Sequence, residues 1–165
     1  MDHLWAPWRM SYIEAAAGPG SAACIFCIPG AGAGEDRERL VVHRASGAFA
    51  MLNRYPYNPG HLMVAAYDHG GDLGSMEPAA WAAVAAEVRL AARVLSQTLR
   101  CDGFNGGWNQ GRLAGAGFAD HLHVHLVPRW AGDTNFMPVV ADVKVVPEHL
   151  DETHRRLAEA FAIGS

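Results

Sequence analysis

The sequence predicts an α+β fold in which an antiparallel sheet packs against one long helix. Short strand-like segments group in two parts of the chain, residues 40–67 and 103–130. Between them lies an alanine-rich segment with helical periodicity, and a second helical segment closes the chain. An order of strands, helix and strands is typical of an antiparallel sheet.

The length of 165 residues favours one domain that is large enough for a proper core. Before the core, residues 15–23 and 29–36 are rich in glycine. We expect both stretches to be loops on either side of the short CIFC segment, which runs from Cys24 to Cys27.

Three strands are expected in the first half of the core. Residues 40–43 and 48–52 are short apolar segments with a turn near Gly47, and residues 61–67 form a third segment, HLMVAAY. A proline-rich turn at residues 53–60 joins the second segment to the third. This order predicts an antiparallel meander.

A long helix is expected over about residues 76–100, which contain no internal glycine. Apolar residues recur there at intervals of three and four, which marks the face that packs on the sheet. These residues are Trp81, Val84, Val88, Ala91, Leu95 and Leu99. Two further strands, residues 103–109 and 121–130, are joined by the glycine-rich segment 111–117, and a last helix is expected over about residues 148–162.

The last expected strand, HLHVHLVPRW, places histidine at every second position. Because successive side chains of a strand point to opposite faces, His121, His123 and His125 should share one face. Leu122 and Leu126 should point into the core on the other face. A shift of register by one residue would bury the imidazoles, so the pattern fixes the register.

The composition excludes several classes of protein. The net charge of −4 gives no basic surface of the kind that attracts nucleic acid. The N-terminus MDHLWAPWRMSY does not resemble a secretory signal, and no stretch approaches the length of a membrane span. We expect a cytoplasmic protein without nucleic-acid or membrane partners. Its three cysteines do not suggest a disulfide framework.

The residues alone allow three interpretations of the histidine strand: a metal site, a nucleophilic site that acts on phosphate, and a binding surface. Imidazole binds zinc or iron well, but three ligands along one straight strand would require it to bend. Glycines at 111, 115 and 117 could expose backbone N–H groups to an anion. A neutral imidazole is available as a nucleophile near pH 7.

HLHVHLVPRW resembles the motif His-φ-His-φ-His-φ-φ of the histidine triad (HIT) family of nucleotide hydrolases and transferases. The segments LWAPWRMSYI, NRYPYNPGHLMV, GRLAGAGFADHLHVHLVPRW and GDTNFMPV resemble the branch that contains bacterial diadenosine tetraphosphate phosphorylase-like and hydrolase-like proteins. The resemblance extends over about residues 4–147. It implies a five-stranded antiparallel sheet with a long packing helix and a C-terminal helix, and a homodimer.

The resemblance also implies roles for single residues. His123 would be the nucleophile that forms a nucleotidyl-histidine, and His125 would contact phosphate and assist proton transfer. Asn53 matches the position that binds the ribose, and Asn109 matches a polar side chain near the scissile phosphate. Backbone donors would come from the loop before the triad, at Gly115, Ala116 and Gly117. Many relatives have Gly-Gln-Ser or Gly-Gln-Thr there, so the side-chain contacts of this longer loop differ.

Some members of the family bind a structural zinc through a Cys-x-x-Cys pair, a later histidine and the first histidine of the triad. The matching residues are Cys24, Cys27, His69 and His121. Such a tetrahedron is closed and structural, and it would tether the N-terminal segment to the sheet. His43 and His61 are alternative third ligands. A redox role for the cysteine pair is disfavoured because no thioredoxin-like unit flanks it.

The resemblance therefore implies a nucleotide hydrolase or transferase that cleaves dinucleoside polyphosphates at the α-phosphorus. A phosphorylase that uses inorganic phosphate, and a nucleotide-binding module with little turnover, are the alternatives. We expect a single domain over residues 1–165, divided into an N-terminal segment with the zinc site (1–39), the core (40–147) and a C-terminal helix (148–165). His149 and His154 are expected to be solvated.

Overall fold

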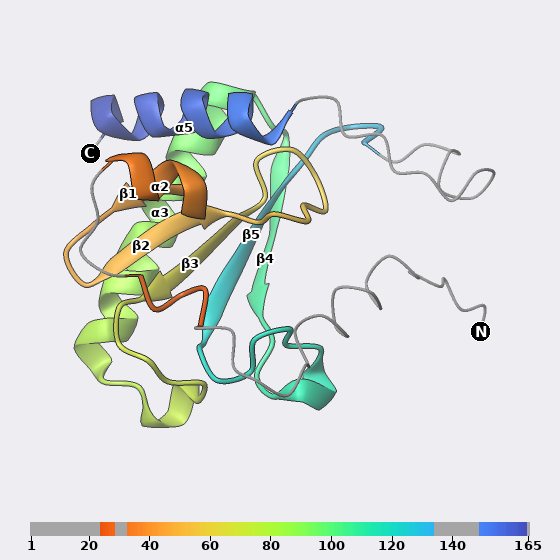
Figure 1. Cartoon of the computed structure of the whole chain (residues 1–165). Coiled ribbons are helices and arrows are strands. Elements are labelled where there is room, and N and C mark those ends of the chain that lie inside the picture. Colours follow the sequence, from red (N-terminus) through yellow and green to blue (C-terminus); the bar gives the residue numbers. More distant parts are fainter. Residues whose placement is uncertain (1–23, 29–32, 134–148, 165) are drawn as a thin grey trace, which may run out of the picture.

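A five-stranded antiparallel sheet forms the centre of the computed structural model, which describes residues 24–28, 33–133 and 149–164 (Figure 1). The strands are β1 (Val41–Arg44), β2 (Ala48–Leu52), β3 (Leu62–Ala66), β4 (Gly103–Trp108) and β5 (His123–Arg129). Their order across the sheet is β1-β2-β3-β5-β4. The predicted α+β architecture with one antiparallel sheet is confirmed.

The histidine strand β5 lies inside the sheet, between β3 and β4. Ala65 of β3 pairs with His123, and Gly107 of β4 pairs with His125. The prediction that the strand begins at residue 121 is wrong by two residues, because β3 ends at Ala66 and offers no further ladder partner. His121 therefore leaves the ladder, and its side chain can turn toward a different site.

Two helices cover one face of the sheet, α3 (Pro78–Leu99) behind it and α5 (Leu150–Gly164) at its upper end in Figure 1. Pro78 suits the first turn of α3, where the missing N–H costs no hydrogen bond. Arg100 ends the helix in the left-handed region with φ 51°. No helix in the described ranges combines the length and apolar character that crossing a membrane requires.

The short helix α2 (Ala33–Arg39) corrects the prediction that residues 29–36 form only a loop. Its first turn carries Glu35 and Asp36, and its last turn carries Arg37 and Arg39, which complements the helix dipole. Asp36 also pairs with Arg44 of β1 at 2.7 Å. The nearby glycines concealed this charge pattern in the sequence.

The two faces of the sheet carry separate clusters of buried side chains. Val124 and Leu126 of β5 join the main core under α3 and α5. On the opposite face, Phe26 and Ile28 pack on Met63 and other strand residues. Residues 24–28 therefore cover part of the face that carries His123 and His125.

Two histidines join β1 to the helices. His154 of α5 is buried and donates from Nε2 to the carbonyl of Val41 at 2.9 Å, so the prediction that it is solvated is wrong. His43 bonds the buried carboxyl of Glu87 at 2.9 Å, and its ring stacks on Phe161 with centroids 4.9 Å apart. The other oxygen of Glu87 is buried without a hydrogen-bond partner among the described residues. His149, by contrast, is exposed as expected.

Replacing His43 by leucine should lower the free energy of unfolding by about 3 kcal/mol near neutral pH, because Glu87 would stay buried without its partner. Burial raises the pKa of Glu87 above its ordinary value of 4.5. A carboxyl of this kind stabilises the folded state below that value and loses the contribution as the pH rises through its folded pKa. The loss should therefore grow as the pH rises above 4.5.

Urea unfolding at several pH values checks this expectation. The double variant His43→Leu/Glu87→Leu is the matched control, since it removes the carboxyl as well as its partner. If His43→Leu lowered the free energy of unfolding by the same amount at every pH, Glu87 would not be the group responsible.

Candidate active site and metal centre

His123 lies at the start of β5 and is buried. Its Nδ1–H donates to the carbonyl oxygen of His121 at 2.9 Å, since a carbonyl can only accept. Burial lowers the pKa of His123, so the ring is neutral near pH 7. One proton on Nδ1 leaves the lone pair on Nε2, which is the form that a nucleophile requires.

The ring of His123 is held from both sides. Phe26 stacks on it with centroids 4.4 Å apart and planes inclined by 23°. His125 meets it edge to face at 4.9 Å. The lone pair on Nε2 therefore has a fixed direction, which reduces the cost of orienting the ring during a reaction.

A chain of hydrogen bonds fixes the tautomer of His125. The backbone N–H of Tyr57 donates to Nδ1 of His61 at 3.1 Å, so the proton of that neutral ring lies on Nε2. Nε2 of His61 lies 3.0 Å from Nδ1 of His125 and donates to it. The proton of His125 must then lie on its own Nε2, where it can be given to another group.

His61 was predicted only as an alternative metal ligand, and its position beside His125 was missed. It precedes β3, and the pairing of Met63 with His125 places it on the same face. The alternation of side chains along β3 could have shown this face. The partner strand, however, is fixed by the insertion of β5 between β3 and β4, which no local pattern reveals.

An open cavity of about 590 Å³ lies along β4 and β5 on the face of the two histidines. The residues of interest in its lining are His125, Asn109, Gly115, Asn58, Asn105 and Arg129. Ladder register orders them, because Gly107 pairs with His125 and Asn105 pairs with Val127. Asn109 therefore lies toward the His123 end, and Arg129 lies toward the other end.

The loop before the triad departs from the expected anion site. Gly111 and Gly115 have positive φ, 82° and 89°, and enclose a short 3-10 turn, Arg112–Ala114. The N–H of Gly115 donates to Arg112 at 3.0 Å and that of Ala116 to Gly111 at 3.3 Å. These two donors are used within the loop in this structure.

Of the other predicted binding residues, Asn109 lies closest to expectation, since it lines the cavity and its Nδ2 lies 3.5 Å from the carbonyl of Gly115. Ala116, Gly117 and Asn53 are not in the lining. Asn53 follows β2, and its Oδ1 accepts the N–H of Tyr55 at 2.9 Å. That bond closes a turn, so the structure gives Asn53 a local role.

The four predicted metal ligands come together beside the triad. Cys24, Cys27, His69 and His121 each offer an atom, and these atoms all lie within 4.8 Å of one another. Sγ of Cys27 lies 3.1 Å from Nδ1 of His69, and Sγ of Cys24 lies 3.6 Å from Nδ1 of His121. Two thiols and two imidazoles at this spacing could hold a metal ion.

The orientation of His121 fits such an ion. Its Nε2–H donates to the carbonyl of Ala66 at 3.0 Å, which leaves the lone pair on Nδ1, toward the two cysteines. A hydrogen bond from the other ring nitrogen is the usual support of a histidine that binds metal. The alternative ligands His43 and His61 are excluded, because each is bonded elsewhere, to Glu87 and to His125.

The chain is similar to known proteins. A family model described as the HIT domain matches residues 35–132. The chain is 41% identical over 169 residues to the AP-4-A phosphorylase of Mycobacterium tuberculosis (strain CDC 1551 / Oshkosh), which covers 98% of this chain and 85% of that protein. It is 32% identical over 112 residues to an uncharacterized HIT-like protein of Methanocaldococcus jannaschii, covering 67% of this chain and 81% of the relative.

A solved structure is also similar. It is that of a Zn-bound histidine triad family protein from Mycobacterium smegmatis, with a TM-score of 0.65 and 26% sequence identity. The match covers 87% of this chain and 96% of that chain. The fold is therefore similar to that of a protein whose structure is Zn-bound.

Proposed function

Because this chain belongs to the HIT family of nucleotide-processing enzymes, we propose that it is a phosphorylase of diadenosine tetraphosphate. The observation that supports this most is the 41% identity to AP-4-A phosphorylase over nearly the whole chain. The sequence left hydrolysis as the main expectation and phosphorolysis as an alternative. The similarity favours the alternative.

The first step follows from the tautomers. Nε2 of His123 attacks the α-phosphorus of one adenylyl group and forms a P–N bond. The bond from that phosphorus to the bridging oxygen breaks, and ATP leaves. Nε2–H of His125 would protonate the departing oxygen, and the contact of His61 with Nδ1 of His125 supports this role by keeping the proton on Nε2.

The second step restores the enzyme. An oxygen of inorganic phosphate attacks the adenylyl-histidine, the P–N bond breaks, and ADP forms. His125, now without its proton, can accept one from the attacking phosphate. One diadenosine tetraphosphate and one phosphate therefore give one ATP and one ADP.

Incubation of the protein with diadenosine tetraphosphate, with and without phosphate, tests the proposal. ADP and ATP should accumulate together over many turnovers only when phosphate is present; without phosphate, no ADP and at most one ATP per chain should form. A hydrolase would instead release AMP in both samples. A binding module would form no product in either.

Zinc is the metal that we propose for the Cys24, Cys27, His69 and His121 cluster. Two thiolates and two imidazoles form the closed tetrahedral set that a structural zinc prefers. Bound there, zinc would cross-link residues 24–28 to the sheet. With four protein ligands, it would have no coordination position left for a reacting water. Phe26, between the two cysteines, would then be held against the ring of His123.

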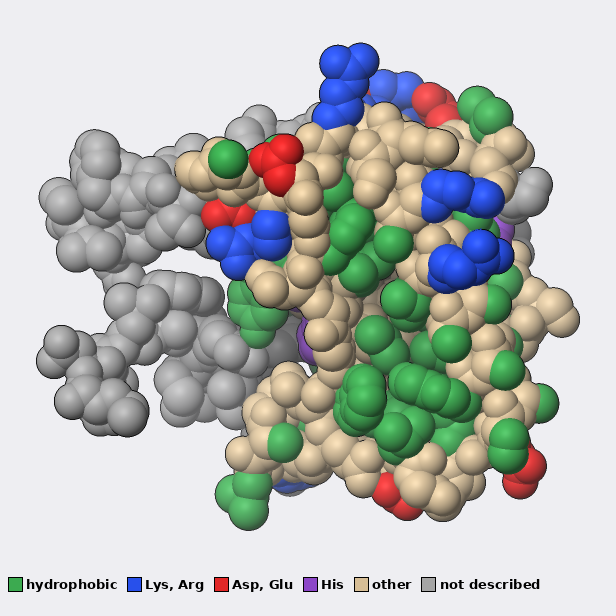
Figure 2. All heavy atoms as spheres, turned by 180° about the vertical axis from the view of Figure 1, so that it is seen from behind, with side chains coloured by type: hydrophobic (Ala, Val, Ile, Leu, Met, Phe, Trp, Pro, Cys, Tyr) green, Lys and Arg blue, Asp and Glu red, His purple; other side chains and the backbone are tan. Residues whose placement is uncertain are grey.

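A second copy of this chain is the partner that we propose for the outer edge of β4. β4 lies at the edge of the sheet with exposed or half-buried residues, so its outer hydrogen-bonding groups can pair with another strand. Trp108 is 44% exposed and meets Trp81 of α3 at 5.6 Å. Figure 2 shows hydrophobic side chains gathered on the lower part of the face seen from behind.

Replacing Trp108 by lysine should shift the protein from dimer to monomer, because a charge would be buried in the apolar contact. Light scattering at micromolar concentration measures the mass. Leu113→Lys is the matched control, since Leu113 is a fully exposed apolar side chain outside β4, in the 3-10 turn Arg112–Ala114. A parent protein that is already monomeric would rule out the dimer.

A further inference from the structure

Arg129 is the one cation among the described residues that line the cavity beside β5. It follows His125 by four residues and lies on the same face of the strand. The reaction proposed above needs only the part of the cavity near His123 and His125. The part around Arg129 has no role in those two steps.

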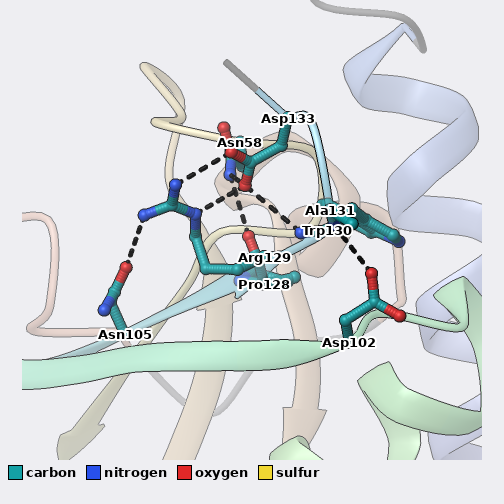
Figure 3. Close-up of polar contacts among 8 residues, drawn as sticks. All are labelled: Asn58, Asp102, Asn105, Pro128, Arg129, Trp130, Ala131 and Asp133. Atoms are coloured by element: carbon teal, nitrogen blue, oxygen red, sulfur yellow. Dashed lines mark hydrogen bonds and ion pairs between the residues drawn. The ribbon is translucent and has the colours of Figure 1, made fainter.

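The guanidinium of Arg129 points along β5 toward its N-terminal end, where His123 and His125 lie. Its NH1 donates to Oδ1 of Asn105 at 2.7 Å, and Asn105 is the ladder partner of Val127 (Figure 3). The charged group therefore lies beside the pair of residues that comes next after Gly107 and His125. A step of two residues along a strand is about 7 Å.

Asp133 fixes this orientation. It accepts from both Nε and NH2 of Arg129, and also from Nδ2 of Asn58 at 2.9 Å and the N–H of Trp130 at 3.2 Å. These donors, Arg129 first, hold the pKa of Asp133 well below its usual range, so the carboxyl is ionised. An arginine held in this way loses little side-chain entropy when it binds a ligand.

The arginine is the accessible member of this pair. Its side chain is 44% exposed, whereas that of Asp133 is 10% exposed. Three of the five guanidinium N–H groups are used, two on Asp133 and one on Asn105. Two N–H groups remain for a ligand, and the carboxylate is already covered by four donors.

Beside His125 the floor of the cavity is open, and between His125 and Arg129 it is formed by Asn105 and Val127. Gly107 has no side chain, and a Cβ built there would meet nothing within 4 Å. A phosphate chain that extends from the α-phosphorus at His123 past His125 would cross this gap and reach the guanidinium. A single phosphate at His123 would not.

We propose that Arg129, supported by Asn105, binds the distal phosphates of a nucleoside polyphosphate and so selects substrates by chain length. This inference rests on the proposed function for the position of the α-phosphorus. Arg129 would then be a specificity-determining residue for the leaving polyphosphate. A purely structural role, as a clasp on the turn at residues 129–133, is the competing explanation.

Calorimetric binding of ATP and AMP tests the inference, with both nucleotides titrated into His123→Ala protein so that neither is consumed. Adding Arg129→Gln should weaken ATP binding about tenfold, the scale for one hydrogen bond to a charged group, and leave AMP binding within about twofold. The loss for ATP should shrink at high salt, because the lost interaction is ionic. Asn105→Ala should also weaken ATP binding, although it leaves the positive charge of Arg129 in place.

Two outcomes would overturn the inference: equal weakening of ATP and AMP by Arg129→Gln, as a structural clasp predicts, or no change for either. Asn105→Ala leaves the Arg129–Asp133 pair intact, so it keeps the test decisive if Arg129→Gln unfolds. Failure of the proposed function is recognised separately. In that case the parent protein would give no ADP from diadenosine tetraphosphate and phosphate, whatever the ratio of the two binding constants.

Discussion

Replacing His123 by alanine should lower the turnover of diadenosine tetraphosphate by about 10⁴-fold or more, which is the usual loss of rate when a covalent nucleophile is removed. The reason is that His123 is the nucleophile of the proposed first step. Its Nδ1–H is held by the carbonyl of His121, and burial keeps the ring neutral. Rates of ATP release measure the loss.

His149→Ala is the matched control for this prediction, since His149 is an exposed histidine far from β5 in the sequence. The parent enzyme, quenched without phosphate, should also gain the mass of one adenylyl group, and the alanine variant should not. Turnover by His123→Ala at the parental rate, with no adenylyl group on the parent, would refute the mechanism.

Removing the proposed zinc should have the second largest effect. Cys24→Ser is expected to lose about one zinc per chain and to lower Tm by roughly 10 °C, as a loss of about 4 kcal/mol would. The cause is the release of residues 24–28, which place Phe26 against the sheet. Metal analysis and thermal unfolding provide the two measurements.

Cys101→Ser is the matched control, because Cys101 is a free thiol outside the cluster. It should retain the metal and the parental Tm. Full zinc content in Cys24→Ser would contradict the ligand assignment, and an unchanged Tm after complete metal loss would contradict its structural role.

Much of the fold could be predicted because its strands and main helices carry clear periodicities. The stripe from Trp81 to Leu99 indicates α3, and the segment 48–52 coincides with β2. The helix α2 could not be recognised in a glycine-rich stretch, since its support comes from the contact of Asp36 with Arg44. The burial of His154 depends on the distant carbonyl of Val41, which no local pattern shows.

The candidate site divides in the same way. The candidate metal ligands follow from the family resemblance, and the alternation of His123 and His125 follows from their spacing. The place of His61 and the clasp on Arg129 depend on which strands and loops become neighbours. Glycines at 111 and 115 suggested free backbone donors, but the short turn between them consumes the donors of Gly115 and Ala116.

His121 takes part in both the candidate metal site and the candidate active site. The ring of His121 belongs to the candidate metal site, while its carbonyl oxygen accepts the Nδ1–H of His123. If the contact of Cys24 and Cys27 with His121 were lost, the carbonyl of His121 would shift. Nε2 of His123 would then be misaligned, although every chemical group would still be present. Protein that has lost this contact could therefore have an unchanged covalent mass and yet be inactive.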